Sequence, residues 1–272
     1  MLKVKYKKLK FDTDYLINFD LGMNDYNIYP EIIGLLFDYR KFILTPFINE
    51  GCVYKLQNIC RKIGLKINFY KSKFHGYEEN LYSHFPNYHK TVATIYKSSQ
   101  NIKSFFNALN SNNAIKIGKL LGYPLCCCKF HYKQGQEGDV NCINTYNNSK
   151  KPFNFYLFNL NHKYRIISHF PCSYHCIESI KLSKNILKII KEINGIKLYN
   201  TFIERMREDY IFINSKYYPI KYRSFHQNHN LAFELNLSPN TMFYIDENSI
   251  KSDEIELIRN KDNKNYLIFK FK

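Results

Sequence analysis

The chain of 272 residues has no tryptophan and little arginine, which supplies only 7 of its 40 basic residues. It has no run of about 18 uncharged apolar residues, the length that a membrane-spanning helix needs. Its lysine-rich start, Met1 to Asp14, has no apolar run after the charges, so it does not resemble a secretory signal. These absences argue against a membrane partner and predict a soluble, cytoplasmic protein.

The formal net charge of +17 would normally suggest nucleic acid or another anionic partner. Lys, Asn, Ile, Tyr and Phe are all frequent, however, and all have A/T-rich codons, so a genomic A/T bias explains the excess without a partner. Nucleic-acid sites also tend to favour Arg, whose planar fork binds phosphate and guanine bidentately. Nucleic acid is therefore the second choice of partner, with the basic, Tyr-rich segment Lys216 to Arg223 as its candidate contact.

No internal repeat and no long Pro/Gly/Ser linker divides the chain, and 45% of its residues are apolar, enough for a sizeable core. We predict an α+β protein made of three regions. Residues 1–95 form a mixed α/β N-terminal part, residues 96–195 a helical, cysteine-bearing middle, and residues 196–272 an antiparallel β-rich C-terminal part.

Periodicity and turn residues locate the elements of the first two regions. Helical spacing predicts helices over Tyr54–Ile63, Asn101–Leu109, Asn113–Leu121, Cys126–Gln134 and Ile177–Ile193. Extended patterns predict strands over Leu65–Tyr70, Thr91–Tyr96 and Phe153–Leu160. The asparagine-rich stretch Asn141 to Lys151 is predicted to be a loop.

Eight cysteines are many for a chain of this size, and three of them are adjacent. In a reducing compartment, clustered cysteines more often indicate metal binding or catalysis than disulfides. Two short strings hold the informative ones, and each has a proline just before its cysteines and opens a predicted helix. The first string contains Cys126, Cys127 and Cys128, and the second contains Cys172 and Cys176.

A helix N-terminus presents unpaired N–H groups and the positive end of the helix dipole. Both favour the thiolate, which is the form of cysteine that binds metals. Sulfur ligands select zinc, copper(I) or iron–sulfur centres over magnesium or calcium. We therefore predict that one metal or cluster is held by Cys126, Cys127, Cys172 and Cys176, whereas Cys52, Cys60 and Cys142 are incidental.

The spacing of these cysteines narrows the kind of centre. Zinc knuckles usually have paired C-x(2–4)-C ligands, whereas Cys126 and Cys127 are directly adjacent. The radical-SAM pattern C-x3-C-x2-C is also broken, because Ser179 takes the third position. The sequence thus favours an iron–sulfur cluster of the 4Fe–4S type, with zinc as the alternative, and leaves buried structural thiols or a redox disulfide as plainer interpretations.

The two strings read G-Y-P-x-C-C-x-x-F and, about forty residues later, H-x-P-C-S-x-x-C-x-x-S. Together they resemble an uncharacterised family of prokaryotic proteins, domain-of-unknown-function family 483, over roughly residues 115–190. The matching positions are Gly122, Tyr123, Pro124, Cys126, Cys127, Phe130, His169, Pro171, Cys172, Ser173, Cys176 and Ser179. The resemblance supports the grouping of four cysteines, places Cys128 at a variable position, and supplies no reaction.

Four further residues in or beside the strings are candidates for the site. His169 is a candidate proton carrier, ligand or hydrogen-bond donor to sulfur. Tyr123, Ser173 and Ser179 are candidate contacts of the cofactor. The plainer interpretations are that Tyr123 packs beneath its loop, that Ser173 caps the following helix, and that Ser179 bonds back to a carbonyl.

We predict a metalloprotein that uses its iron–sulfur cluster for redox or sulfur-transfer chemistry on an unknown small-molecule or macromolecular substrate. The alternative is a basic module, stapled by zinc or a cluster, that binds RNA or DNA. A third interpretation is an interaction protein with buried thiols and no metal. The sequence offers no complete catalytic set beyond His169, Ser173 and Ser179.

Overall fold

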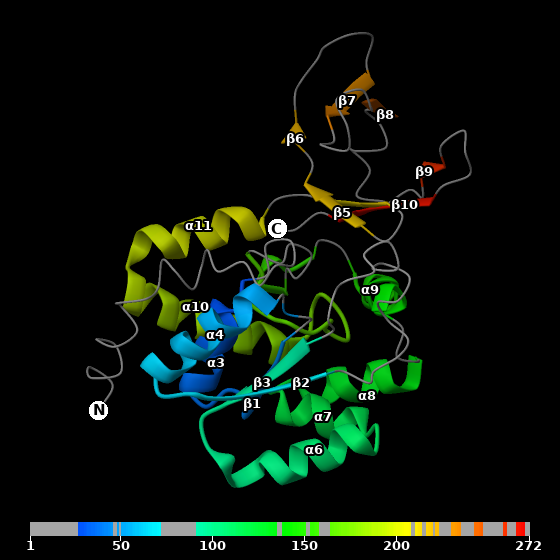
Figure 1. Ribbon diagram of the computed structural model, residues 1–272. Helices are drawn as coiled ribbons and strands as arrows, with labels where there is room; N and C mark the ends of the chain where they lie inside the picture. Colours follow the sequence, from blue (N-terminus) through cyan, green and yellow to red (C-terminus); the bar gives the residue numbers. More distant parts are fainter. Residues whose placement is uncertain are drawn as a thin grey trace.

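The computed structural model describes residues 27–45, 48, 50–71, 91–134, 138–150, 153–157 and 164–207, and seven short strands between residues 210 and 269. Helices dominate the described part, and a small antiparallel sheet lies among them (Figure 1). This arrangement confirms the α+β class. No helix of the described residues is long and apolar enough to cross a membrane. The lysine-rich start, Met1 to Asp14, which does not resemble a secretory signal, lies outside the described residues.

The central sheet has three antiparallel strands in the order β1-β3-β2, formed by Phe42–Leu44, Thr91–Tyr96 and Lys66–Lys71. Both faces of the middle strand are covered, because its residues from Val92 to Tyr96 are all buried. The cross-strand pair Phe42 and Tyr96 packs on one face with the helical part of the chain that carries Phe105. The neighbouring pair, Ile43 and Ile95, faces the larger core on the other side.

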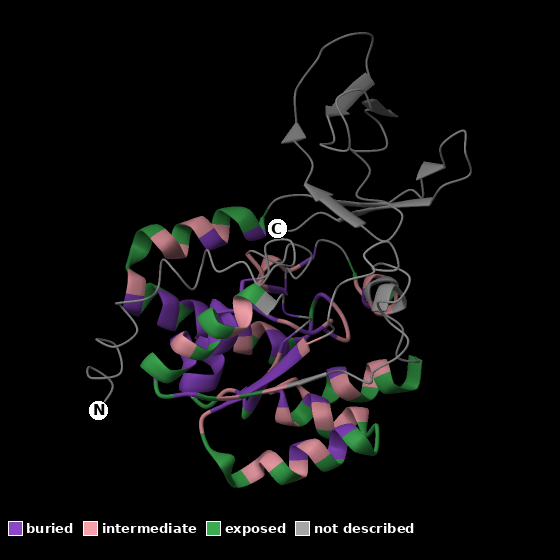
Figure 2. Ribbon diagram, viewed as in Figure 1, coloured by how far each residue is buried: buried purple, intermediate pink, exposed green. Residues whose placement is uncertain are grey.

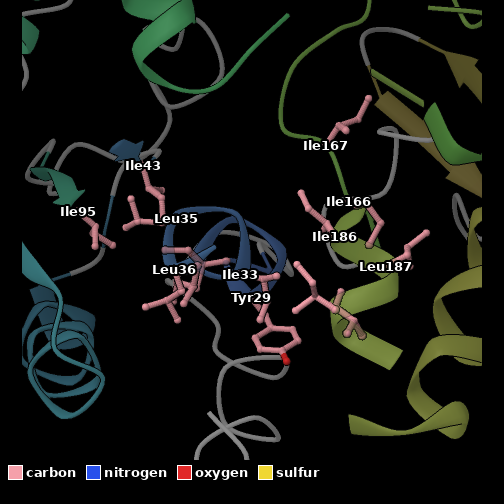
Figure 3. Close-up of a cluster of buried hydrophobic side chains, with 14 of the residues drawn as sticks. Tyr29, Ile33, Leu35, Leu36, Ile43, Ile95, Ile166, Ile167, Ile186 and Leu187 are labelled. Carbon is pink, nitrogen blue, oxygen red and sulfur yellow. The ribbon is translucent and has the colours of Figure 1, made fainter. Parts of the chain in front are cut away.

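The larger core is built around α3 (Tyr29–Leu36), in which every residue is buried. Leu35 and Leu36 lie on the side of the sheet, whereas Tyr29 and Ile33 lie toward α10 (Ile177–Asn194) (Figure 3). A helix that is apolar all round belongs in an interior, and Figure 2 shows its buried ribbon at the centre of the molecule. The helix α4 (Glu50–Lys62) adds Leu56 and Cys60 to the same core.

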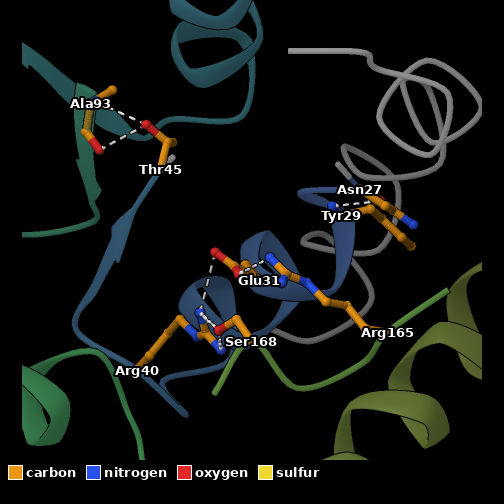
Figure 4. Close-up of polar contacts among 8 residues, drawn as sticks. All are labelled: Asn27, Tyr29, Glu31, Arg40, Thr45, Ala93, Arg165 and Ser168. Carbon is orange, nitrogen blue, oxygen red and sulfur yellow. Dashed lines mark hydrogen bonds and ion pairs between the residues drawn. The ribbon is translucent and has the colours of Figure 1, made fainter. Parts of the chain in front are cut away.

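A buried ionic cluster fixes α3 to Arg40, just beyond its C-terminal end, and to the distant segment that carries Arg165 and Ser168 (Figure 4). Glu31 lies 3.4 Å from the Arg40 guanidinium and 3.7 Å from that of Arg165. Arg40 also contacts the Ser168 hydroxyl at 3.4 Å through both terminal nitrogens. Because a buried carboxylate is costly without partners, this cluster holds Arg165 and Ser168 in place, directly before His169.

Three short helices follow β3, namely α6 (Ile102–Asn110), α7 (Ala114–Leu120) and α8 (Leu125–Gln134). Asn113 caps α7 by accepting a hydrogen bond from the Lys116 N–H at 3.0 Å. Gly122 ends it with a φ of +82°, and a Cβ there would lie 2.5 Å from the Tyr39 carbonyl oxygen. Only glycine fits such a turn, which sets the direction of α8.

The structure corrects the loop that was predicted over Asn141 to Lys151. Residues 141–147 belong to α9 (Gly138–Asn147), although their asparagines suggested a turn. The reason is a tertiary contact, because Thr145 is fully buried and its hydroxyl donates to the Pro171 carbonyl at 2.7 Å. The predicted strand Phe153 to Leu160 is also wrong in its described part, which contains the 3-10 helix η2 (Phe155–Leu157).

The β-rich C-terminal region begins later than predicted, because α11 (Ile196–Met206) follows α10 after Gly195. Apolar residues of this helix, such as Phe202 and Met206, pack into the larger core. The strands beyond it are β4 (Tyr210–Ile213), β5 (Lys216–Pro219), β6 (Lys221–Tyr222), β7 (Asn230–Glu234), β8 (Met242–Asp246), β9 (Ile258–Arg259) and β10 (Asn265–Phe269). They pair antiparallel in the orders β5-β4-β10-β9 and β6-β7-β8. The side chains of Lys216 to Arg223 lie outside the described part of the chain.

Candidate metal centre

The starts of α8 and α10 supply three of the four predicted ligands. Cys126 and Cys127 lie in the first turn of α8, just after Leu125. Cys176 is the N-cap residue of α10, with a non-helical backbone (φ −59°, ψ 109°). The structure thus corrects the prediction that Ser173 caps this helix. The Ser173 hydroxyl instead accepts a hydrogen bond from the His175 N–H at 3.2 Å, and the structure shows no contact of it with the sulfurs.

The four sulfur atoms meet at one point. The Sγ atom of Cys176 lies 3.6 Å from those of both Cys126 and Cys127, and the latter two are 3.9 Å apart. With Cys172, all four lie within 4.8 Å of one another. This spacing is close enough for one metal to bind all four, so the grouping predicted from the sequence is confirmed.

The cluster has a buried side and an open side. Cys127 and Cys176 are buried, with 1% and 7% of their surface exposed, Cys172 is half-buried, and Cys126 is exposed. Of the other cysteines, Cys60 is fully buried in the core, as expected, and burial raises its pKa to about 12. The side chain of Cys142 lies outside the described residues. Cys126 therefore forms the solvent-exposed edge of the cluster.

Hydrogen bonds among the thiols distribute the protons unevenly. The thiols of Cys127 and Cys172 donate to Cys176 and hold its pKa well below the usual range. Bonds to Cys172 and Cys176, followed by burial, raise the pKa of Cys127. The Cys172 backbone N–H also points at the Cys127 sulfur, at 3.3 Å. Since metals bind thiolates, a metal that bound here would replace the shared protons of this set.

Behind Cys127 lies a buried polar chain formed by two residues predicted from the sequence. The Ser179 hydroxyl is 3.4 Å from the Cys127 sulfur and 2.9 Å from Nε2 of His169. The ring of His169 in turn packs on that of Tyr123, with centroids 4.9 Å apart. Burial, with the Arg40 charge as a second cause, lowers the pKa of His169 to about 3. His169 is therefore neutral at pH 7 and contacts the sulfurs through Ser179.

The loop that carries Cys172 is held by His131, which the sequence offered only as a weaker candidate for the site, and by two asparagines that it did not single out. His131 on α8 lies 3.2 Å from the Pro171 carbonyl oxygen through Nε2 and 3.0 Å from the Asn141 side chain through Nδ1. The Asn148 amide donates to the Cys172 carbonyl at 2.8 Å. The spacing of His131 supports its place beside the site, because it follows Cys127 by four residues and so shares its helix face.

No protein-family model, no curated protein and no solved structure matches this chain. The resemblance to family 483 therefore stays a prediction, and function has to be argued from the site. The site itself is a set of four cysteine thiols, close enough to bind one metal, between two helix starts that are fifty residues apart in sequence.

Proposed function

We propose that the protein is a metalloprotein whose four cysteines bind a single tetrahedral ion, with zinc as the leading candidate. The observation that carries this proposal is the spacing of the sulfurs. A zinc–sulfur bond of about 2.3 Å and tetrahedral angles require sulfurs about 3.8 Å apart. The separations of 3.6, 3.6 and 3.9 Å among the sulfurs of Cys126, Cys127 and Cys176 agree with this value, and the Cys172 sulfur lies within 4.8 Å of all three.

A closed four-thiol site is typical of structural zinc. Here the ion would join α8 to the start of α10 and to the loop of Cys172, which are distant in sequence. Because the ligands meet only in the folded chain, metal binding would add directly to the stability of the fold. In this proposal the metal positions α8 and the surfaces that α8 carries.

The second candidate is the iron–sulfur cluster favoured by the sequence, serving redox or sulfur-transfer chemistry. In a 4Fe–4S cube each thiolate binds a different iron, so the sulfurs must lie farther apart than around one ion. The exposure of Cys126 supports this candidate, because a solvent-facing thiol at a helix start has room to swing outward. The iron held by Cys126 would then face the substrate, and the neutral, buried His169 would position Ser179 against Cys127.

Metal and acid-labile sulfide analysis of protein purified without oxygen tests the proposal, together with an absorption spectrum. A colourless protein with about one zinc per chain is the expected result. A brown protein with equal iron and sulfide would replace the single ion by the cluster and make the redox enzyme the leading function. A protein without any metal would overturn both candidates and leave the thiols as core or redox residues.

A further inference from the structure

A cavity of about 400 Å³ opens beside the metal centre. Its volume lies in the range of small-molecule sites, roughly 300–1,000 Å³. The wall shared with the centre contains Cys127 and His169, and Tyr123 lies next to them. The cavity thus adjoins a metal ligand on the side away from the exposed Cys126.

The lining of this cavity indicates the chemistry of its ligand. Of the described residues that line it, none is an Asp, Glu, Lys or Arg. Leu109, Ile117 and Leu121 give apolar walls, while Asn112 and Asn141 offer amide groups. Apolar walls with a few uncharged hydrogen-bonding groups suit an uncharged molecule that has an apolar face and a polar edge. A nucleobase is such a molecule.

The outer surface of the helices that form the cavity is strongly basic. Four lysines are exposed there, namely Lys116 and Lys119 on α7 and Lys129 and Lys133 on α8. Lys119 directly follows Gly118, which lines the cavity.

This part of the chain is more basic than the overall positive charge of the protein would give. The chain has 23 acidic residues among 272, yet none lies between residues 91 and 134, which include α6, α7 and α8. An A/T bias explains many lysines but no loss of acids, since Asp and Glu also have A/T-rich codons. A stretch of chain with exposed lysines and no acids, next to a cavity without charged lining residues, is suited to a phosphate backbone that presents a base.

An exposed aromatic ring stands at the same place. Tyr132 is 57% exposed and lines the cavity, and it lies on α8 between Lys129 and Lys133. Aromatic rings beside lysines serve as stacking platforms for the bases of single strands. An acidic protein partner would not require an exposed ring among the residues that line a cavity.

We infer that this cavity and its lysine rim bind a single-stranded nucleic acid, with one base inside beside Cys127, a neighbouring base on Tyr132, and phosphates on the α7 and α8 lysines. This inference rests on the proposed metal centre, which fixes the start of α8. Single-stranded nucleic acid would then be the substrate of the basic module that the sequence offered as an alternative. Its contact would lie on α7 and α8 rather than on the C-terminal segment Lys216 to Arg223 that the sequence suggested.

The test is fluorescence anisotropy of the metal-loaded full chain with a labelled single-stranded RNA of about 12 nucleotides, and with the matching DNA, at about 50 and 200 mM salt. The double variant K129E/K133E should bind at least about tenfold more weakly, with a salt slope reduced by about 1.4. Y132A should lose about tenfold through lost stacking. The matched control, K181E/K188E, makes the same charge change on exposed lysines of α10 and should bind like the wild type.

Three outcomes would overturn the inference. One is the absence of binding to either strand at about 50 mM salt. Another is an equal loss in the α10 control, and the third is equal affinity for a sugar–phosphate strand without bases or for poly-glutamate. Metal content is measured for every protein. A metal-loaded chain that does not bind nucleic acid therefore contradicts this inference but not the proposed metal centre. A metal-free wild-type chain that binds RNA contradicts the proposed metal centre instead.

Discussion

At the scale of single residues, the four ligand cysteines differ sharply from the fifth cysteine beside them. Cys127 is buried, contacts the Cys176 sulfur at 3.6 Å and accepts a hydrogen bond from the Cys172 backbone. Cys128 points to the other side of α8, where its Sγ bonds to the Tyr123 carbonyl at 3.7 Å. Side chains at adjacent helix positions point in different directions. Cys127 therefore faces the other three sulfurs, whereas Cys128 does not.

We therefore expect Cys127→Ser to lower the affinity for metal by more than about 100-fold, since even second-shell partners contribute 10–100-fold. Cys128→Ser is the matched control and should leave metal affinity unchanged. The measurement is a titration of each metal-free protein with zinc against a competing chelator. Equal affinities of the two variants would contradict the assignment of ligands.

His169 makes the stability of the protein depend on pH. Burial lowers its pKa to about 3, whereas a histidine in the unfolded chain has a pKa of about 6.5. As the pH falls below about 6.5, this histidine becomes protonated in the unfolded chain but stays neutral in the folded chain. The free energy of unfolding should then fall by up to about 1.4 kcal/mol per pH unit from this residue.

His169→Gln should make this decline shallower in urea unfolding measured between about pH 6.5 and 4.5. The decline should not vanish, because burial also lowers the pKa of His131. Measurement at pH 8 gives the cost of the substitution that does not depend on pH. Parallel curves for the variant and the wild type would show that His169 does not titrate in this way.

At the scale of elements, the connection from α7 to α8 depends on Gly122. An alanine there would have a positive φ and would meet the Tyr39 carbonyl at 2.5 Å. We expect Gly122→Ala to destabilise the fold by about 3 kcal/mol or more. Gly64→Ala is the control, because Gly64 has a φ of +75° but nothing within 4 Å of the added atom, and should cost only about 1 kcal/mol. Equal losses in urea unfolding would contradict a steric role for the Tyr39 contact.

The contact between α9 and the Cys172 loop depends on Thr145. Its buried hydroxyl donates to the Pro171 carbonyl, one residue before the ligand. Thr145→Val keeps the shape but removes the bond, so it should cost about 1–2 kcal/mol and weaken metal binding. Thr201→Val, which removes an exposed bond within α11, should change neither quantity by much. The free energy of unfolding and the zinc affinity are measured for both variants. Equal values in the two variants would contradict a role of α9 in holding the site.

At the scale of the whole molecule, the centre links parts of the chain that come together only on folding. Free metal at about 100 times its dissociation constant should stabilise the fold by about 2.7 kcal/mol, and the melting temperature should rise by several degrees. The gain should shrink as the pH falls, because metal competes with protons and the pKa of Cys127 is raised. Melting curves with metal and with chelator at pH 7.5 and pH 6 measure it. An equal melting temperature with metal and with chelator would contradict a structural role for the metal.

The elements that the sequence predicted well are those whose signals are local. Helices α6, α7, α8 and α10 begin and end within one or two residues of their predicted bounds, because apolar spacing, Asn113 and Gly122 act within a few residues. The predictions failed at α9 and η2, where asparagines and a short apolar run had misleading local preferences. Buried contacts such as that of Thr145 outweigh a weak propensity.

For the site, the sequence by itself determined which four cysteines were predicted to meet, because Cys126 and Cys127 open one predicted helix and Cys172 and Cys176 precede another. Only the tertiary structure decided what surrounds them. The contact of Ser179 with Cys127, the hydrogen bond of His131 with Pro171 and the ion pair of Glu31 with Arg165 join residues that are 40 or more positions apart in sequence. No local pattern encodes such pairs, since burial creates the need for a partner and the packing of distant elements supplies it.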